Sequence, residues 1–406
     1  MTAGRGASSI AGSIDDPVFA RAPRSELERR WAAVRQYMAE RGLDAVVTVG
    51  FDDSLSGYVR WFCDFGASAY MKAVLFFADG PMATVEHGAL DGVGERSPND
   101  PNNPGVGKVY STATFKSVAA TFTYEADAVV TELKRRGVRR VGLIRKGGMP
   151  HAFVARLEEG LTGVEWSDET DALDRLKAVK SPVELASLRD ACRIQDEVFA
   201  KVLEKVRPGV REVELLAFAE HEFRLRGAID GTMASGSAPS GQSAGLRPWR
   251  SQNRILQQGD CFTILLEMSN DAGYYGELAR QVVIGKPTQE HRGALKVIKE
   301  AQAATVSRFL PGASCAEIAA AHDKFMIGRG CEAEARLFSH SQGYDLVERP
   351  LVRRDETMSL EAGMFLSCHP VVATPTLFAF LCDNFIIKPD GPAERVHTTP
   401  QEIFQV

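Results

Sequence analysis

Two histidines in the last third of the chain are the first residues that could do chemistry. His340 stands between two serines, in a run that turns at Gly343 and ends at Pro350. His369 closes an apolar strand directly before a proline. Imidazole nitrogens bind metal ions and exchange protons near neutral pH. Two histidines at the ends of strands therefore indicate a candidate site.

One carboxylate follows the first histidine closely. Glu348 lies eight residues after His340, and a carboxyl group beside a histidine can act as a general acid or base. The alternative is an ion pair with Arg349 or Arg353, which would make Glu348 a structural residue. The sequence leaves both interpretations open.

A group of arginines and aromatic residues could bind an anionic substrate. Arg247, Trp249 and Arg250 lie close together, and Tyr274 and Tyr275 follow in the next predicted hairpin. Arginine binds carboxylates through two parallel hydrogen bonds, so the group predicts a small organic acid as the substrate class. The alternative is a solvated surface with two unrelated arginines.

Arg60 and Trp61 belong to an aromatic run, Tyr58 to Gly66, that we place in a loop or at a strand end. Core filling is the plain interpretation of such a run, because aromatic side chains usually pack. The functional interpretation is a wall over a neighbouring active site. His87 and His151 have no partner at a useful spacing, and we expect them to be structural.

The composition narrows the class of protein. The chain has 406 residues, of which 44% are apolar and 25% charged, and this length allows two domains with separate cores. A net charge of -5 argues against a nucleic-acid surface. No apolar stretch approaches the roughly 20 residues that span a bilayer. Seven scattered cysteines without a Cys-x-x-Cys pair indicate reduced thiols in a cytoplasmic protein.

The order of the expected elements predicts two domains. Residues 1–14 are small and polar, as in a disordered tail and unlike a signal peptide. Helices and short strands alternate over residues 15–175, which is typical of an α/β domain. Helices are expected at 25–41 and 122–136, and strands at 44–50, 73–79 and 140–144. Ser25 and Glu28 have the spacing of a capping box at the start of the first helix. A helix start at Ser181-Pro182 opens the second domain, residues 176–406.

The second domain contains an internal duplication. Segments 207–227 and 310–330 match at a single shift of 103 residues, including a Pro-Gly pair at the start of each. Such self-similarity implies two related halves about a pseudo-twofold axis, with a site expected at their seam. Strands complete an α+β domain with one curved sheet; they are expected at 260–267, 274–285, 364–372 and 378–388.

Taken together, these motifs resemble the pita-bread superfamily of creatinase, prolidase, aminopeptidase P and methionine aminopeptidase. The resemblance covers nearly the whole chain and implies a creatinase-type α/β amino-terminal domain followed by a pita-bread domain. The matching motifs are Lys180-Ser-Pro-x-Glu184, the repeated Pro-Gly helix start, the strand after Gly259-Asp260, Gly273-Tyr-x-x-Glu277-x-x-Arg280, Ser339-His-Ser-x-Gly343, Leu360-x-x-Gly-Met364 and Pro389-Asp-Gly391.

The resemblance also assigns candidate metal ligands. Metallopeptidase members hold two metal ions at five positions, which fall here at Leu266, Glu277, His340, His369 and Cys382. Four of these side chains can bind a metal, although imidazole and thiolate replace carboxylates at the last two positions. Because the leucine removes one subsite, we expect one divalent ion, iron or zinc, and not two. A metal-free site, as in creatinase, is the alternative.

Glu267 follows Leu266 and could take the lost position only through a one-residue slip of the hairpin. Strand alternation turns its side chain to the opposite face of the sheet from Leu266. We therefore expect Glu267 to lie outside the site.

These departures from the family pattern predict an enzyme that no longer hydrolyses peptide bonds. The expected activity is hydrolysis of an amide or amidine C–N bond in a small carboxylate-bearing molecule, with Glu277, His340 and Glu348 as catalytic residues. The alternatives are a mononuclear-iron lyase, decarboxylase or oxygenase on the same fold, and an inactive binding module. Substrate contacts are assigned to Arg60, Trp61, Arg247, Trp249, Arg250 and Tyr275. The resemblance further implies a homodimer in which Arg60 and Trp61 reach the partner's cleft.

Overall fold

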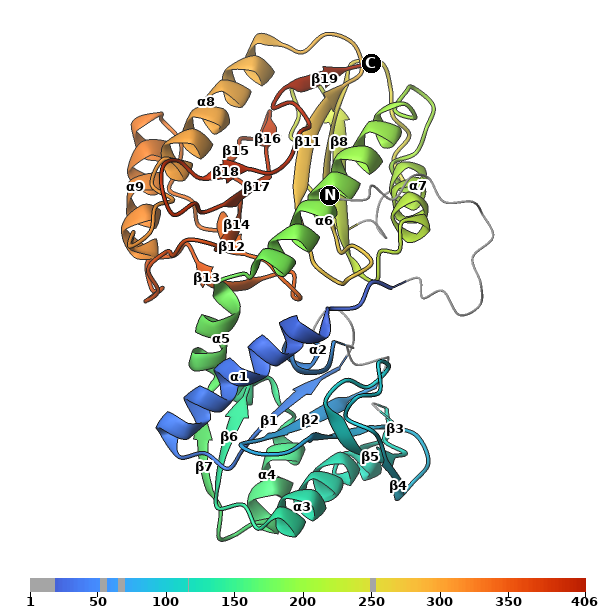
Figure 1. Cartoon of the computed structure of the whole chain (residues 1–406). Helices are drawn as coiled ribbons and strands as arrows, with labels where there is room; N and C mark the ends of the chain where they lie inside the picture. Colours follow the sequence, from blue (N-terminus) through green and yellow to red (C-terminus); the bar gives the residue numbers. More distant parts are fainter. Residues whose placement is uncertain (1–18, 52–56, 65–69, 116, 249–252) are drawn as a thin grey trace, which may run out of the picture.

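The computed structural model describes residues 19–406 except 52–56, 65–69, 116 and 249–252. The predicted tail, residues 1–14, lies outside the described residues. Two units are joined through helix α5 (Thr170–Ala178), with the smaller amino-terminal unit below the larger carboxyl-terminal unit in Figure 1. None of the described helices has both the length and the apolar character needed to cross a membrane.

A seven-stranded mixed sheet forms the centre of the amino-terminal unit, in the order β4-β5-β3-β2-β1-β6-β7. Alternate residues of its strands face opposite sides. Val46 and Phe76 pack with α1 (Arg24–Arg41), whereas Val47 and Leu75 pack with α3 (Tyr124–Arg136) and α4 (His151–Gly160). The strands are β1 (Ala45–Gly50), β2 (Lys72–Phe77), β3 (Met82–His87), β4 (Gly92–Glu95), β5 (Val106–Thr112), β6 (Arg140–Ile144) and β7 (Glu165–Asp168).

Two local predictions in this unit are wrong. Helix α1 starts after Pro23 with no side-chain cap, so Ser25 and Glu28 form no capping box. The aromatic run is a helix, α2 (Gly57–Cys63), and not a loop or strand end. Tertiary packing explains why the aromatic run is helical, because α2 buries Val59, Trp61 and Phe62 in the same core as α1.

Helix α6 (Pro182–Leu203) opens the carboxyl-terminal unit at the predicted Ser181-Pro182 start, and a capping box forms there. The Ser181 hydroxyl accepts from the Glu184 backbone, and the Glu184 carboxylate accepts from the Ser181 backbone. Two five-stranded sheets follow, in the orders β19-β11-β10-β8-β9 and β13-β12-β14-β17-β18. Their strands are β8 (Gly231–Pro239), β9 (Arg247–Pro248), β10 (Asp260–Met268), β11 (Leu278–Val283), β12 (Ser339–Ser341), β13 (Glu348–Leu351), β14 (Phe365–Cys368), β17 (Asp383–Ile386), β18 (Glu394–Arg395) and β19 (Ile403–Gln405), and a hairpin of β15 (Val371–Ala373) and β16 (Phe378–Phe380) stands apart.

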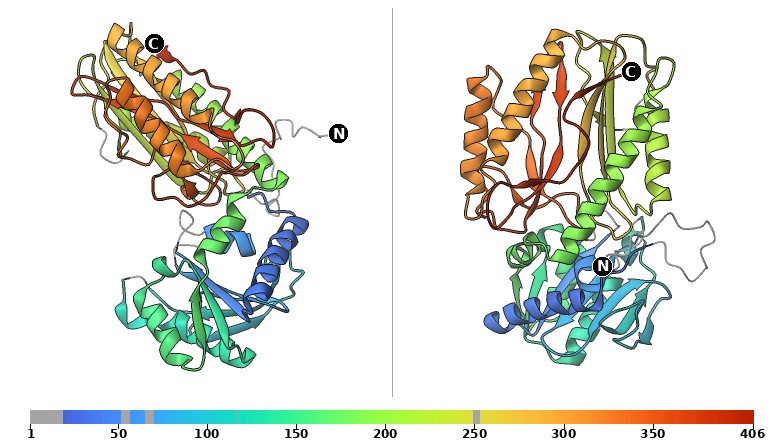
Figure 2. Two further views of the ribbon diagram at one scale, coloured as in Figure 1. Left: turned by 90° about the vertical axis from the view of Figure 1, so that its left-hand side faces the viewer. Right: turned by 45° about the horizontal axis from the view of Figure 1, so that its top comes forward.

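The internal duplication is confirmed in the backbone. Helices α7 (Glu212–Leu225) and α9 (Cys315–Gly328) have 14 residues each and are related by the predicted shift. Gly209 and Gly312 precede them with φ of 88° and 86°, a conformation that favours glycine. The predicted single sheet is divided into two sheets, and an isolated bridge between Ala279 and Cys382 lies where their strands meet. The right-hand view of Figure 2 shows the helices of the two halves, α6 and α7 in green and α8 (Gln289–Val306) and α9 in orange, on the two sides of the strands.

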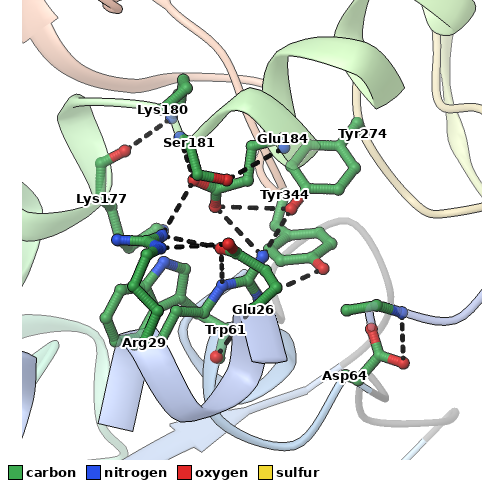
Figure 3. Close-up of polar contacts among 12 residues, drawn as sticks. Glu26, Arg29, Trp61, Asp64, Lys177, Lys180, Ser181, Glu184, Tyr274 and Tyr344 are labelled. Carbon is green, nitrogen blue, oxygen red and sulfur yellow. Dashed lines mark hydrogen bonds and ion pairs between the residues drawn. The ribbon is translucent and has the colours of Figure 1, made fainter. Parts of the chain in front are cut away.

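A buried set of charges joins the two units (Figure 3). Arg30 of α1 is fully buried; its Nε lies 2.8 Å from Glu26, and its Nη2 lies 3.2 Å from Glu184 of α6. The same Nη2 donates to the hydroxyl of Tyr274 at 2.8 Å. Because Tyr274 belongs to the hairpin that leads to Glu277, this contact connects α1 with the segment that carries the candidate site.

Candidate metal centre

Three of the predicted ligands converge at the seam of the two halves. Glu277 stands directly before β11, His340 lies in β12, and His369 follows β14. Their ligand atoms all lie within 4.8 Å of one another. Glu277 Oε2 is 3.5 Å from His340 Nε2 and 3.8 Å from His369 Nε2. Residues 92 positions apart in the chain thus present their donor atoms to one point.

All three side chains are buried, with exposed fractions of 3% for Glu277, 5% for His340 and 6% for His369. Within the described residues, Glu277 Oε2 and both ring nitrogens of His369 have no hydrogen-bond partner. Buried polar atoms without partners are costly and rare. A cation held between these atoms would satisfy them, so the arrangement fits a metal site.

Burial also sets the protonation of the site. It lowers the pKa of His340 to about 4 and that of His369 well below its ordinary value, so both imidazoles are neutral at pH 7. Burial raises the pKa of Glu277 to about 7. Neutral imidazole is the form that binds metal ions, so both histidines are ready to act as ligands.

Cys382 does not belong to this group of three. Its thiol shares a hydrogen bond with Glu277, and burial raises the pKa of the thiol well above its ordinary value. The residue sits at the bridge to Ala279, where it packs with Phe380. The structure thus shows Cys382 as a neutral partner of Glu277, although the sequence predicted a ligand.

Glu267 is the residue that the sequence reasoning considered and excluded. In the β10–β11 pair Leu266 stands opposite Leu278, and the bridge from Ser269 to Tyr275 continues the same register. Glu267 therefore lies opposite Glu277, on the same face of the hairpin. The expectation that it lies outside the site is wrong because Leu266 and Leu278 both turn into the apolar core. The ten-residue separation of the two glutamates across a tight hairpin was the available signal.

Two buried amides connect the Glu267 carboxylate with the backbone of Glu277. Gln342 Nε2 donates to Glu267 Oε1 at 2.9 Å, and Asn384 Nδ2 donates to Gln342 Oε1 at 2.7 Å. The backbone N–H of Glu277 donates to Asn384 Oδ1 at 2.7 Å. Burial raises the pKa of Glu267 well above its ordinary value, and the neighbouring Glu277 adds to this effect. A chain of hydrogen bonds thus runs from one glutamate to the other.

Glu348 occupies a different environment from the one predicted. Its carboxylate is 2.5 Å from Lys180 Nζ and 3.1 Å from Lys177 Nζ. Burial opposes ionisation of Glu348, but the two lysines outweigh burial and lower its pKa to about 2. The group stays ionised at neutral pH, which argues against a role as general acid. The alternative pairings are also wrong, since Arg349 binds Glu356 and Asp171 and Arg353 binds Asp355.

The structure describes four of the six predicted substrate contacts. Trp249 and Arg250 are outside the described residues, and Arg247 is exposed in the short strand β9. Trp61 is 2% exposed, in an apolar cluster that includes residues of both units, as the core interpretation expects. Arg60 lies against Gly273 of its own chain. Tyr275 is buried, and its backbone N–H donates to Gly343 at 2.9 Å.

Arg336 is a cation beside the site that the sequence did not single out. Its Nη2 lies 3.5 Å from the carbonyl oxygen of His369, and its guanidinium carbon lies 5.6 Å from the centre of the Phe380 ring. It is among the groups that counteract the effect of burial on the pKa of Glu277. The side chain is half exposed and paired with Glu334. It therefore connects the buried donors with the surface.

Comparison with known proteins decides the family. The profile of metallopeptidase family M24 matches residues 186–389, half of the chain. The chain belongs to metallopeptidase family M24. This M24 chain is 23% identical to an Xaa-Pro dipeptidase of Pyrococcus horikoshii over 66% of its length and 76% of the relative's. It is 26% identical to a probable dipeptidase, PepE, of Mycobacterium bovis over 58% of its length and 63% of the relative's.

Solved structures show the same fold across nearly the whole M24 chain. An X-Pro aminopeptidase from Thermotoga maritima superimposes with a TM-score of 0.76 at 17% identity, covering 93% of this chain and 99% of the other. A prolidase from Pyrococcus horikoshii gives a TM-score of 0.72 at 19% identity, covering 93% and 100%. The predicted two-domain pita-bread fold is confirmed by these neighbours.

The names of the relatives correct the predicted activity. We expected a hydrolase of C–N bonds other than peptide bonds, with non-hydrolytic and inactive alternatives. The curated relatives and the structural neighbours are named as dipeptidases, prolidases and aminopeptidases, which act on peptide bonds. The prediction of a non-peptide substrate rested on the replaced ligand positions alone, and the names of the relatives contradict it.

Proposed function

We propose that this M24 chain is a metal-dependent hydrolase of peptide bonds in short peptides, and that it works with one ion held by Glu277, His340 and His369. The observation that carries the proposal is the convergence of three buried donors within 4.8 Å. Unpartnered atoms on Glu277 and His369 add to it.

The donor set suits a particular kind of ion. Two imidazoles and one carboxylate fit zinc or Fe(II), with coordination positions left for water and substrate. When bound, such an ion supplies Lewis-acid activation of water and of a carbonyl group. Leu266 turns into the core with Leu278, so no side chain at that position is available for a second ion.

Glu267 is the residue we assign to proton transfer. It lies opposite Glu277, and Gln342 fixes one of its carboxylate oxygens. A carboxyl group held beside a metal site can take a proton from water and give it to the leaving amine. This role replaces the one that the sequence assigned to Glu348.

The substrate class follows from the names of the relatives and from Arg336. Dipeptides, including those with proline in second position, are the first substrates to test. Their free carboxylate can reach Arg336, whose guanidinium lies between the His369 carbonyl and the surface. A cytoplasmic homodimer is the setting we propose for this activity, and light scattering of the purified chain tests the dimer.

The decisive experiment combines metal analysis with a peptide assay. We expect purified protein to hold about one zinc or iron ion per chain, and to cleave members of a dipeptide panel with and without proline. His340→Ala should lose both the ion and the cleavage. Cys382→Ala should keep the ion, because the thiol stands outside the donor group.

The exposed His151 offers a matched control. His151→Ala removes an imidazole from the surface of α4 and should change neither metal content nor turnover. A metal-loaded wild-type protein that cleaves no dipeptide, or a His340→Ala variant with full activity, would refute the proposal.

A further inference from the structure

A separate cavity lies in the amino-terminal unit, far along the chain from the metal ligands. Its volume is about 210 Å³, and it is lined mainly by Phe51, Tyr70, Met71, Thr114, Phe122 and Glu125. The lining comes from the end of β1, the start of β2 and the segment between β5 and α3. Apart from Thr114 and Glu125, these six side chains are apolar or aromatic.

Aromatic rings form the walls of this cavity and continue behind them. The ring of Tyr70 stacks on His87, with centroids 3.8 Å apart and planes 13° apart. Phe115 packs edge-on against both rings, at 6.1 Å and 5.3 Å. The Phe51 ring already has a cation near it, since the guanidinium carbon of Arg145 lies 5.7 Å from its centroid. The faces of such rings carry negative potential and attract cations.

Glu125 is the feature that apolar packing does not explain. It stands in the first turn of α3 and is only 2% exposed, and its Oε2 has no hydrogen-bond partner among the described residues. Burial raises its pKa, although Thr114 and His87 counteract the effect. Burial of the charged form is costly, so Glu125 alone favours its neutral form, and a cation beside it would stabilise the carboxylate. This environment therefore favours a ligand that brings positive charge.

We propose that this cavity binds a small alkylated ammonium ion, with the rings of Phe51, Tyr70 and Phe122 around the cation and Glu125 as its counterion. Alkyl groups on the nitrogen suit the walls, because these rings accept a diffuse charge and offer few hydrogen-bond acceptors for N–H groups. The site belongs to the amino-terminal unit and does not depend on the proposed hydrolysis.

Calorimetric titration of the full-length chain tests the proposal. Choline and tetramethylammonium are the cationic probes, and 3,3-dimethylbutan-1-ol is the neutral probe with the shape of choline. We expect choline to bind at least about tenfold more tightly than the neutral alcohol, because only choline gains the cation–π and ionic contacts. Equal binding of the two would show an apolar cavity only. Absence of choline binding would also overturn the proposal.

Two variants assign the binding to this cavity. Glu125→Gln keeps the shape and removes the charge, and it should weaken choline binding about tenfold, whereas Glu158→Gln on the exposed side of α4 should not. Phe122→Leu replaces a half-exposed ring by an alkyl group at the cavity wall and should weaken choline binding several-fold. Wild-type affinity in both cavity variants, with folding verified by circular dichroism, would refute the assignment.

Discussion

Glu267 and Glu277 lie opposite each other across the β10–β11 hairpin, so that two buried carboxyl groups share one face of the sheet. Two carboxylates this close repel each other, which favours a proton on one of them. Glu277 also faces the two histidines, whereas Glu267 faces Gln342. This geometry supports the proposed division of roles, with Glu277 as a metal ligand and Glu267 in proton transfer.

Replacing Glu267 should separate chemistry from metal binding. Glu267→Gln keeps the hydrogen-bonding shape beside Gln342 but cannot exchange a proton. We expect metal content to stay at the wild-type level and kcat to fall by about 10²- to 10⁴-fold, the usual range for loss of a general acid or base. Metal analysis and dipeptide kinetics on the same preparation give both values. Glu277→Gln is the comparison, and it should lose the ion as well. A Glu267→Gln variant with wild-type kcat would remove the assigned role.

Gln342 should act on the site without touching the ion. It links Glu267 to Asn384, and Asn384 accepts from the backbone of Glu277. Gln342→Ala should weaken metal affinity by about ten- to a hundredfold, the usual effect of removing a residue that orients the ligands. Competition with a chromogenic chelator measures this change. Unchanged affinity would mean that the amide chain does not position Glu277.

The sequence was sufficient to predict the repeated helices and the helix whose first residues carry a recognisable start signal. The shift between the two halves located α7 and α9, and the Ser181-Pro182 pair located the start of α6. Prediction from the sequence failed where tertiary packing determines the secondary structure. Helix α2 is an example, because its aromatic residues pack in the same core as α1.

The site was predictable only in part. His340 and His369 stand out in the chain, and the Gly-Tyr-x-x-Glu-x-x-Arg motif singles out Glu277. Glu267 could be found only from the register of the hairpin, since a one-residue error exchanges the two faces of a strand. Arg336 carries no local signal at all, because its position beside His369 depends on how distant strands come together.

The ionisation of Glu348 should make the free energy of unfolding depend on pH. Its pKa is about 2 in the folded chain against 4.5 for an ordinary glutamate. Because the folded-state pKa is depressed, the ion pairs with Lys177 and Lys180 stabilise the fold fully above about pH 4.5. This contribution is lost as the pH falls from there towards 2. Urea unfolding between pH 7 and pH 3 should show a falling free energy of unfolding.

The variant Glu348→Gln tests this dependence. It should be less stable than wild type at pH 7, because it leaves the buried Lys180 without its carboxylate and Lys177 with Asp345 alone. Its free energy of unfolding should also change less between pH 7 and pH 3 than that of the wild type. Glu361→Gln, at an exposed position, is the control and should follow the wild-type curve. A Glu348→Gln curve parallel to wild type would contradict the assignment.

Two neighbouring arginines of α1 offer a matched test of the contact between the units (Figure 3). Arg29 and Arg30 both bind Glu26 and Glu184, but the side chain of Arg29 is 43% exposed and that of Arg30 is fully buried. An exposed pair contributes at most about 1 kcal/mol, whereas removing one partner of a buried pair costs about 3–5 kcal/mol. Arg30→Met should therefore lower the free energy of unfolding several times more than Arg29→Met. Urea unfolding at pH 7 gives both values, and equal losses would show that the buried network does not hold the two units together.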